Sequence, residues 1–165
     1  MTDPDPAPDL HPSPDAADPA PASAPRAPRG KPYPGNVITV TFDSARCLHA
    51  AECVRGLPQV FDTARRPWIT PDAAPADEVA EVIRRCPSGA LQYVLVDGAT
   101  ERPESPTTAH RDGRGRLVLR GDLLITPADG GEPVPETRAM LCGCAASAHQ
   151  PYCDRSGRCG AEDAS

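Results

Sequence analysis

The sequence predicts an α+β protein built from two small modules. Segments of alternating apolar and β-branched residues, typical of strands, occur on both sides of a polar stretch that is broken by prolines. Helical periodicity of apolar residues occurs only before that stretch, and the seven cysteines divide into one group on each side of it. We therefore expect a tail, a mixed module, a linker and a β-rich module at residues 1–34, 35–98, 99–112 and 113–165, respectively.

Composition limits the apolar core. The chain has 165 residues, of which 22 are proline, and only 4% are aromatic. Small modules with so little apolar material usually need a staple, and a bound metal is one kind. The formal net charge is −6 and no basic block occurs, which argues against nucleic acid as a partner.

The N-terminal tail, residues 1–34, consists almost entirely of Pro, Ala, Asp and Ser. Such a segment cannot bury enough apolar surface to offset its ordering entropy, and we expect it to be disordered. No stretch approaches the roughly 18 apolar residues of a membrane helix, and the first residues do not resemble a secretory signal. We therefore expect a cytoplasmic protein, in which cysteines stay reduced and bind metal more often than they pair.

The first module begins with a strand. Residues 37–42 alternate and are rich in β-branched side chains. Asp43 and Ser44 can cap a short helix that begins near Cys47, and the glycine at position 56 is expected to close that helix.

A hairpin, a helix and a strand are expected to follow. Two apolar pairs at 60–61 and 68–69 flank a turn-like segment that predicts the hairpin. A helix is predicted from 75 to 85, with proline and acidic residues in its first turn and arginines in its last. Residues 91–96 predict another strand, so the order is of the βαββαβ type.

The second module is predicted to contain only strands. Residues 116–126 suggest two short strands about a turn at Gly121 and Asp122. Residues 137–141 form a further expected strand that leads directly into the C-terminal cysteines.

The cysteines of the first module have a recognisable spacing. Cys47 and Cys53 are separated by five residues, and Cys86 precedes a proline. Bacterial ferredoxins carry Cys-x2-Cys-x2-Cys and a remote Cys-Pro ligand. Measured against that run, Ala50 occupies the middle position, and residues 37–96 resemble a divergent single-cluster ferredoxin.

Three thiolates and one missing ligand leave the type of cluster open. The ferredoxin resemblance implies that Cys47, Cys53 and Cys86 hold either a [3Fe–4S] cluster or a [4Fe–4S] cluster with a ligand other than cysteine. His49 lies next to the missing position, and the alternative for it is an exposed helix residue. The alternative for the three cysteines is a structural role as buried thiols.

Four further cysteines crowd the C-terminal segment, and thiolates so close together need sulfur, zinc or iron as a partner. The segment resembles the CDGSH iron–sulfur domain, because its Cys, Ser, Pro and Asp positions coincide with that motif. The positions in register are Cys142, Cys144, Ser147, Pro151, Cys153, Asp154 and Ser156. The resemblance implies one [2Fe–2S] cluster in a small β-rich fold, with three cysteines and one histidine as ligands. Asp154 is expected to brace the turn by accepting backbone N–H bonds.

Two positions depart from the CDGSH motif. Arg155 replaces a glycine, and Gly157 replaces the ligand histidine. Because two extended residues span about 7 Å, Cys159 can reach the vacant ligand position. His149 is a weaker candidate, and the remaining alternatives are a free thiol at Cys159, a degenerate site or an all-thiolate zinc site.

These features favour an iron–sulfur protein with two clusters that transfers single electrons to an unidentified redox partner, whose basic docking face would suit the acidic chain. Cluster transfer or redox sensing is the alternative, and a structural zinc module is a second one. We find no arrangement of Ser, His and Asp, no phosphate loop and no nucleotide fingerprint, so we expect no enzyme. The CDGSH resemblance also suggests a homodimer through residues 113–165.

Overall fold

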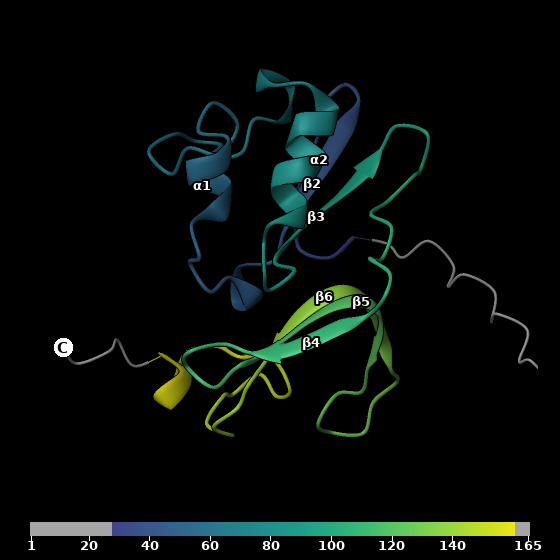
Figure 1. Ribbon diagram of the computed structural model, residues 1–165. Coiled ribbons are helices and arrows are strands. Elements are labelled where there is room, and N and C mark those ends of the chain that lie inside the picture. The colour runs from purple at the N-terminus through teal and green to yellow at the C-terminus, as the bar shows by residue number, and fades with distance from the viewer. Residues whose placement is uncertain (1–27, 161–165) are drawn as a thin grey trace, which may run out of the picture.

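The computed structural model describes residues 28–160 as an α+β protein with two antiparallel three-stranded sheets (Figure 1). In the first sheet, in the order β1-β2-β3, the strands are β1 (Lys31–Tyr33), β2 (Ile38–Phe42) and β3 (Leu91–Leu95). In the second, in the order β4-β5-β6, they are β4 (Thr108–Arg111), β5 (Leu117–Ile125) and β6 (Val134–Leu141). The α+β class predicted from the sequence is therefore correct.

Strand β1 lies inside the stretch that the sequence assigns to a disordered tail. Tyr33 is buried and faces Val40 across the pairing of β1 with β2, and its ring contacts Trp68 edge-on at 6.4 Å. The expectation of disorder is thus wrong for residues 31–33, because the short proline-containing strand pairs with a strand that already has a partner on its other side. The rest of the predicted tail, residues 1–27, lies outside the described residues.

Helix α2 (Ala76–Arg84) packs on one face of the first sheet, and α1 (Glu52–Gly56) lies beside α2 (Figure 1). Helix α2 begins after Pro75 and has acidic residues in its first turn and an arginine in its last, as the sequence predicts. Its apolar stripe enters a core formed with β2, β3 and the segment after α1. The fully buried members of that core include Val40, Val60, Phe61, Ile69, Val79, Ile83 and Leu91.

The segment before α1 is not the helix that the sequence predicts. Asp43 caps only a 3₁₀ turn, Ser44–Arg46, by accepting a hydrogen bond from the N–H of Ala45. His49 and Ala51 then adopt left-handed backbone conformations, with φ of 54° and 61°. These conformations cannot continue a right-handed helix, so α1 begins five residues later than Cys47, at Glu52. Cys47 consequently lies in an irregular loop.

The hairpin between the helices is minimal. Phe61 and Ile69 form a single antiparallel bridge, and Trp68 packs edge-on against Phe42 at 4.8 Å. The sequence therefore predicts the position of this turn correctly, although the bridge is too short to form a strand pair.

Strand β5 is continuous where the sequence suggests two strands and a turn. A register shift between Arg120 and Leu123 absorbs Gly121 and Asp122 as a bulge. Gly121 has φ of 136°, and a Cβ there would lie 2.4 Å from the hydroxyl oxygen of Thr107. The glycine permits this close approach, so it marks a bulge and not a reversal of the chain. Residues 108–111, assigned by sequence to the linker, form β4 against β5.

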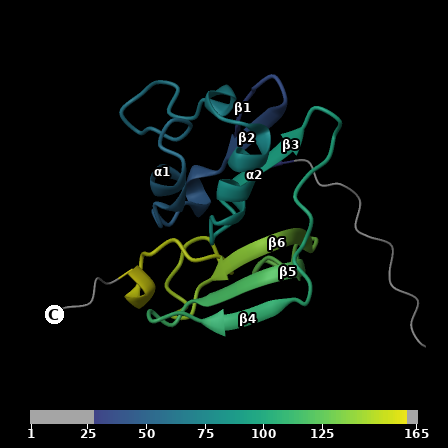
Figure 2. The same cartoon turned by 45° about the horizontal axis from the view of Figure 1, so that its top comes forward.

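The second sheet lies next to the unit that carries the first sheet (Figure 2). Buried charged side chains connect the two parts of the chain. The Glu136 carboxylate on β6 accepts a hydrogen bond at 2.9 Å from Arg46, and further bonds from Arg29 and the Tyr152 hydroxyl. The Arg46 guanidinium also lies over the Tyr152 ring, 4.1 Å from its centroid. Burial and the neighbouring carboxylate raise the pKa of Tyr152 to about 12, so its hydroxyl stays protonated and donates.

A second contact crosses the same interface. Arg138, whose side chain is almost completely buried, donates to the carbonyl of Leu91 on β3 at 2.7 Å and forms an ion pair with Glu101. Arg120 likewise donates to the carbonyl of Arg84 at the end of α2. Arginine side chains from the second sheet thus satisfy backbone carbonyls of the first unit, and the two units are fixed relative to one another.

We expect Glu136→Ala to lower the free energy of unfolding by about 3 kcal/mol, because it leaves the buried Arg46 charge without its carboxylate. Urea denaturation followed by circular dichroism measures the change. Glu132→Ala, on the exposed turn before β6, is the matched control and is expected to change the midpoint little. Equal midpoints for the two variants would show that the ion cluster does not hold the interface.

Candidate metal centres

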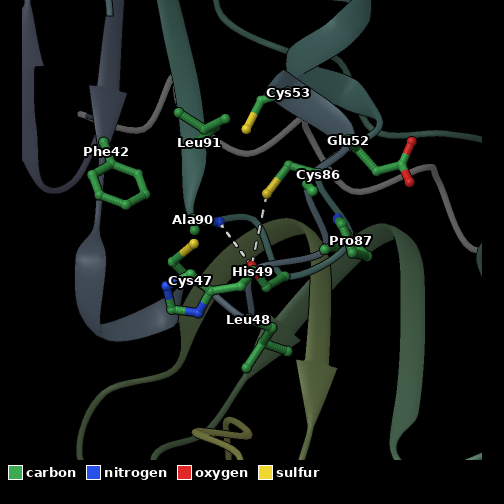
Figure 3. A pocket seen from close by; sticks show the side chains of 13 residues that line it. Phe42, Cys47, Leu48, His49, Glu52, Cys53, Cys86, Pro87, Ala90 and Leu91 are labelled. Carbon is green, nitrogen blue, oxygen red and sulfur yellow. Dashed lines mark hydrogen bonds between the residues drawn. The ribbon is translucent and has the colours of Figure 1, made fainter. Parts of the chain in front are cut away.

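Cys47, Cys53 and Cys86 line one pocket in the first unit (Figure 3). The pocket measures about 340 Å³, part of which is open to solvent. Cys47 comes from the irregular loop, Cys53 from the first turn of α1, and Cys86 from the corner after α2. Apolar side chains of Phe42 and Leu91 form part of the remaining wall. The fold therefore brings together the three cysteines that the sequence predicts as one ligand group.

Backbone N–H groups also point at these sulfurs. The N–H of His49 hydrogen-bonds Cys47, and that of Val54 hydrogen-bonds Cys53. Burial nevertheless dominates and raises the pKa of both thiols. A metal that binds here must displace the thiol protons, so its affinity rises with pH. N–H donors around cysteine sulfurs in an apolar wall are the features that tune iron–sulfur clusters.

Ser88 organises the third cysteine. Its side chain is buried, and its hydroxyl lies 3.7 Å from the Cys86 sulfur and accepts from the N–H of Ala90 at 3.3 Å. Ser88 is not among the site residues that the cysteine spacing predicts. Its position directly after a Cys-Pro pair, in a chain corner, is the signal that could have identified it.

The fourth ligand position of the first centre has no cysteine. Ala50 lines the pocket but has no ligand atom, and His49 is exposed in the loop and not on a helix. Figure 3 shows the Glu52 carboxylate directed away from the three sulfurs. The cysteines thus supply three thiols, which fits an iron–sulfur cluster whose fourth iron has no cysteine ligand.

The second group of cysteines converges after β6. The sulfurs of Cys142, Cys144 and Cys159 lie within 4.8 Å of one another, and those of Cys142 and Cys144 are 3.7 Å apart. Cys153 is outside this trio but is buried against Cys159 in the same apolar cluster. The CDGSH resemblance implies that Cys153 is a ligand. In the structure its side chain lies next to the trio formed by Cys142, Cys144 and Cys159 and not within it.

Backbone pairing explains how residues far apart in the loop meet. The N–H of Cys142 donates to the carbonyl of Pro151, and the N–H of Cys153 donates to that of Met140. The segment around Tyr152 therefore lies alongside the end of β6, and residues 143–150 form the intervening loop.

Asp154 braces the loop, as the sequence predicts. Its carboxylate accepts from the N–H and hydroxyl of Ser156 and from the N–H of Ala148. The hydroxyl bond from Ser156 and these backbone donors hold the pKa of Asp154 far below its usual range. The carboxylate therefore stays ionised and is engaged in structure, not in binding metal.

Gly157 explains why the missing histidine cannot simply be restored. A Cβ at this position would lie 2.4 Å from the Cβ of Ala146 and 2.7 Å from the Cys144 sulfur. No side chain fits there without displacing one of them. Cys159, two residues later in a 3₁₀ turn (Arg158–Gly160), supplies the third sulfur of the trio.

Hydrogen bonds prepare the second group for metal. Donors from the backbones of Cys159 and Ala146 lower the pKa of Cys144 to about 6. Burial opposes ionisation of Cys142, but the N–H groups of Ser147 and Cys144 outweigh it and lower the pKa of that thiol. Burial, with the bond to Cys144, raises the pKa of Cys159 to about 11. Three thiols, two of them readily ionised, suit a metal or iron–sulfur cluster.

The first centre and its surroundings define an iron–sulfur protein, and comparison with known proteins gives the family. Residues 33–96 match the family described as a divergent 4Fe-4S mono-cluster. The uncharacterized protein YjdI of Escherichia coli K12 is 48% identical to this chain over 61 residues, and the YjdI protein of strain O157:H7 gives the same values. Those residues are 37% of this chain and 80% of each relative. The chain belongs to the divergent 4Fe-4S mono-cluster family through this segment.

The family match supports a [4Fe–4S] cluster and covers Cys47, Cys53 and Cys86. No solved structure matches the chain. Within residues 28–160, no helix has both the length and the apolar character needed to cross a membrane.

In the reduced, metal-free protein, Cys144 is expected to react with iodoacetamide at pH 7 well before Cys159. Because its pKa is lowered, Cys144 is mostly thiolate above pH 6, and its reactivity decreases only as the pH falls below that value. The reactivity of an ordinary thiol already decreases below about pH 8.5. Peptide mass mapping across pH 5–9 measures the labelling, with Cys144→Ser to verify the assignment. A midpoint near pH 8.5 for Cys144 would contradict the predicted role of the backbone donors.

Gly157→Ala is expected to weaken the second centre, because the added methyl group must displace Ala146 or the Cys144 sulfur. We expect a loss of metal from this centre and a lower unfolding midpoint. Gly113→Ala is the matched control, since a Cβ at Gly113 meets no atom within 4 Å. Metal analysis and urea denaturation compare the two variants. An unchanged metal content in Gly157→Ala would show that the loop accommodates the added methyl group without displacing Ala146 or Cys144.

Proposed function

We propose that this iron–sulfur protein carries two clusters and transfers single electrons. The first, [4Fe–4S] or [3Fe–4S], would be held by Cys47, Cys53 and Cys86. The second, [2Fe–2S], would be held by the trio Cys142, Cys144 and Cys159 together with Cys153. The observation that carries the proposal is that the seven cysteines, all of them free thiols, form two groups, with backbone N–H donors directed at sulfurs in each.

We further propose that the second module is a CDGSH-type domain. It comprises residues 113–165 and, in addition, strand β4 at residues 108–111, which pairs with β5. Residues 35–98 are then the first module, and residues 99–107 connect the two. The motif residues support this by what they do in the loop. The Ser147 hydroxyl donates to the carbonyl of Tyr152 at 2.7 Å and accepts from the N–H of His149. Asp154 fixes the turn after Cys153. These contacts shape the loop that gathers the cysteines.

An iron–sulfur cluster supplies one-electron chemistry, and the chain's own residues set how readily it operates. In the first centre, Phe42 and Leu91 restrict water around the cysteines, and the N–H of His49 offsets negative charge on Cys47. In the second, the donors to Cys142 and Cys144 do the same. We propose no catalytic role for any residue.

The partner proposed is an unidentified redox protein in the cytoplasm with a basic docking face. The support is the net charge of −6. We propose neither nucleic acid nor a membrane as a partner, and a homodimer through the second module remains a proposal from the CDGSH resemblance.

Cluster transfer or redox sensing is the second candidate function. It is favoured by one observation, namely that Cys142 and Cys144 are only partly buried. Ligands that a thiol of an acceptor protein can approach suit the release of a cluster. Rapid transfer to a metal-free acceptor ferredoxin, with slow electron exchange, would favour this function over electron transfer.

Two serine variants test the assignment of both clusters. Cys86→Ser is expected to lose the EPR signal of the first cluster and keep that of the second, and Cys144→Ser is expected to do the reverse. Iron, sulfide and zinc analysis with EPR, on protein purified without air and examined before and after dithionite, measures this. A signal present only before reduction would identify [3Fe–4S] at the first centre. Zinc without iron or sulfide would leave a zinc-stapled module at the second.

If Cys159 and not a histidine completes the second centre, its reduction potential is expected to stay constant between pH 6 and pH 8. A ligand histidine would instead take up a proton on reduction, and the potential would rise as the pH falls. Redox titration of Cys86→Ser, which isolates the second cluster, measures this. Loss of the second cluster in Cys153→Ser would show that Cys153 is the fourth ligand. A reduction potential that changes steeply with pH would instead indicate that His149 is a ligand.

A further inference from the structure

The two cysteine loops touch one another, although they lie about 100 residues apart in the sequence. Leu48, which follows Cys47, is buried in an apolar cluster whose other members come from the second sheet and the second cysteine group. That cluster contains Val118, Met140, Cys153 and Cys159, with Cys142 and Cys144 packed against it. One side chain of the first loop therefore forms part of the wall of the second centre.

Arg155 makes the return contact. Its guanidinium donates to the carbonyl of Leu48 at 3.3 Å, across 107 residues of sequence. It is also near enough to Cys47 for its positive charge to act on that sulfur. Leu48 and Arg155 thus join the loop of the first centre to the loop of the second through one apolar contact and one charged hydrogen bond.

The backbone at Arg155 indicates that its side chain serves a purpose. The residue has φ of 66°, in the left-handed region that glycine adopts without cost. Glycine occupies the corresponding position of the CDGSH motif. This chain instead has an arginine in a backbone conformation that is unfavourable for it. Among the described hydrogen bonds, the bond from Arg155 to Leu48 is the one that joins the two cysteine loops through a charged side chain.

We propose that Arg155 couples the two centres: it holds the Cys47 loop in place from the second loop and sets the reduction potential of the first cluster through its positive charge. The inference rests on the proposed function, since it concerns a cluster at each centre. Arg155 is a positioning residue, as it acts through Leu48 and through its charge and contributes no ligand. A positive charge next to the first cluster favours its reduced, more negative state.

The test is the reduction potential of the first cluster in the intact two-cluster protein, titrated by EPR, in Arg155→Gly, Arg155→Lys and Arg158→Gln. Arg155→Gly removes the charge and also relieves the backbone, so the variant is expected to fold at least as well as the parent. We expect the equilibrium constant for reduction of the first cluster to fall about threefold, the size of a partly exposed charge interaction. At 59 mV per tenfold change, that is a decrease of about 30 mV.

The other variants separate charge from general effects. Arg155→Lys keeps the charge and is expected to recover most of the potential. Arg158→Gln removes the same charge from an exposed side chain three residues later and is expected to leave the potential unchanged. An unchanged potential in Arg155→Gly, or an equal decrease in Arg158→Gln, would overturn the proposal.

A double-mutant cycle tests the coupling itself. In Cys144→Ser the second centre cannot load, and the first cluster is expected to lose iron to a chelator several times faster than in the parent. If Arg155 couples the two centres, adding Cys144→Ser to the Arg155→Gly variant is expected to accelerate iron loss from the first cluster little further. Equal acceleration in both backgrounds would refute coupling through Arg155. An iron content that Cys144→Ser leaves unchanged would refute the second cluster and hence the proposed function itself.

Discussion

The buried carboxylate of Glu136 is the constraint on which the arrangement of the molecule depends. It lies on β6 and accepts hydrogen bonds from Arg46 of the first unit, from Arg29 before β1 and from Tyr152 of the C-terminal loop. A buried charge is costly unless its hydrogen-bonding capacity is met, so these groups must adopt one mutual position. Arg46 is next to Cys47 in sequence, and Tyr152 is next to Cys153. The carboxylate thereby fixes the placement of both cysteine loops.

Regular elements were largely predictable, because their signal is local. The alternation in β2 and β3, the charge pattern of α2 and the apolar pairs around the bridge of Phe61 and Ile69 all depend on neighbouring residues. Predictions failed where distant residues decide. In the sequence Gly121 looks like a turn glycine. Only its close contact with Thr107, which comes from a preceding segment, identifies it as part of a bulge. Strand β1 forms because it can pair with the free edge of β2. The proline-rich composition of its surroundings gives no local signal for this pairing.

The cysteine groups were predictable for a related reason. Ligand spacing is written in the sequence, and the suggestion that Cys159 reaches the vacant position agrees with its place in the trio. Spacing could not show that Cys153 stands beside the trio, that Ser88 contacts Cys86, or that Leu48 belongs to the wall of the second centre. Each of these depends on how two separately specified loops are pressed together, and that is decided by Glu136 and the arginines around it.

The position of Arg46 has a consequence for the order of events during synthesis. All residues that line the first pocket precede residue 99, so they are synthesised before β6. Until then Arg46 has no Glu136 to bind and Leu48 has no apolar cluster to enter, so the loop between Cys47 and Cys53 is not yet covered. Docking of the second sheet therefore covers Leu48 and one side of the first centre, while the part of the pocket that is open to solvent in the folded chain stays open.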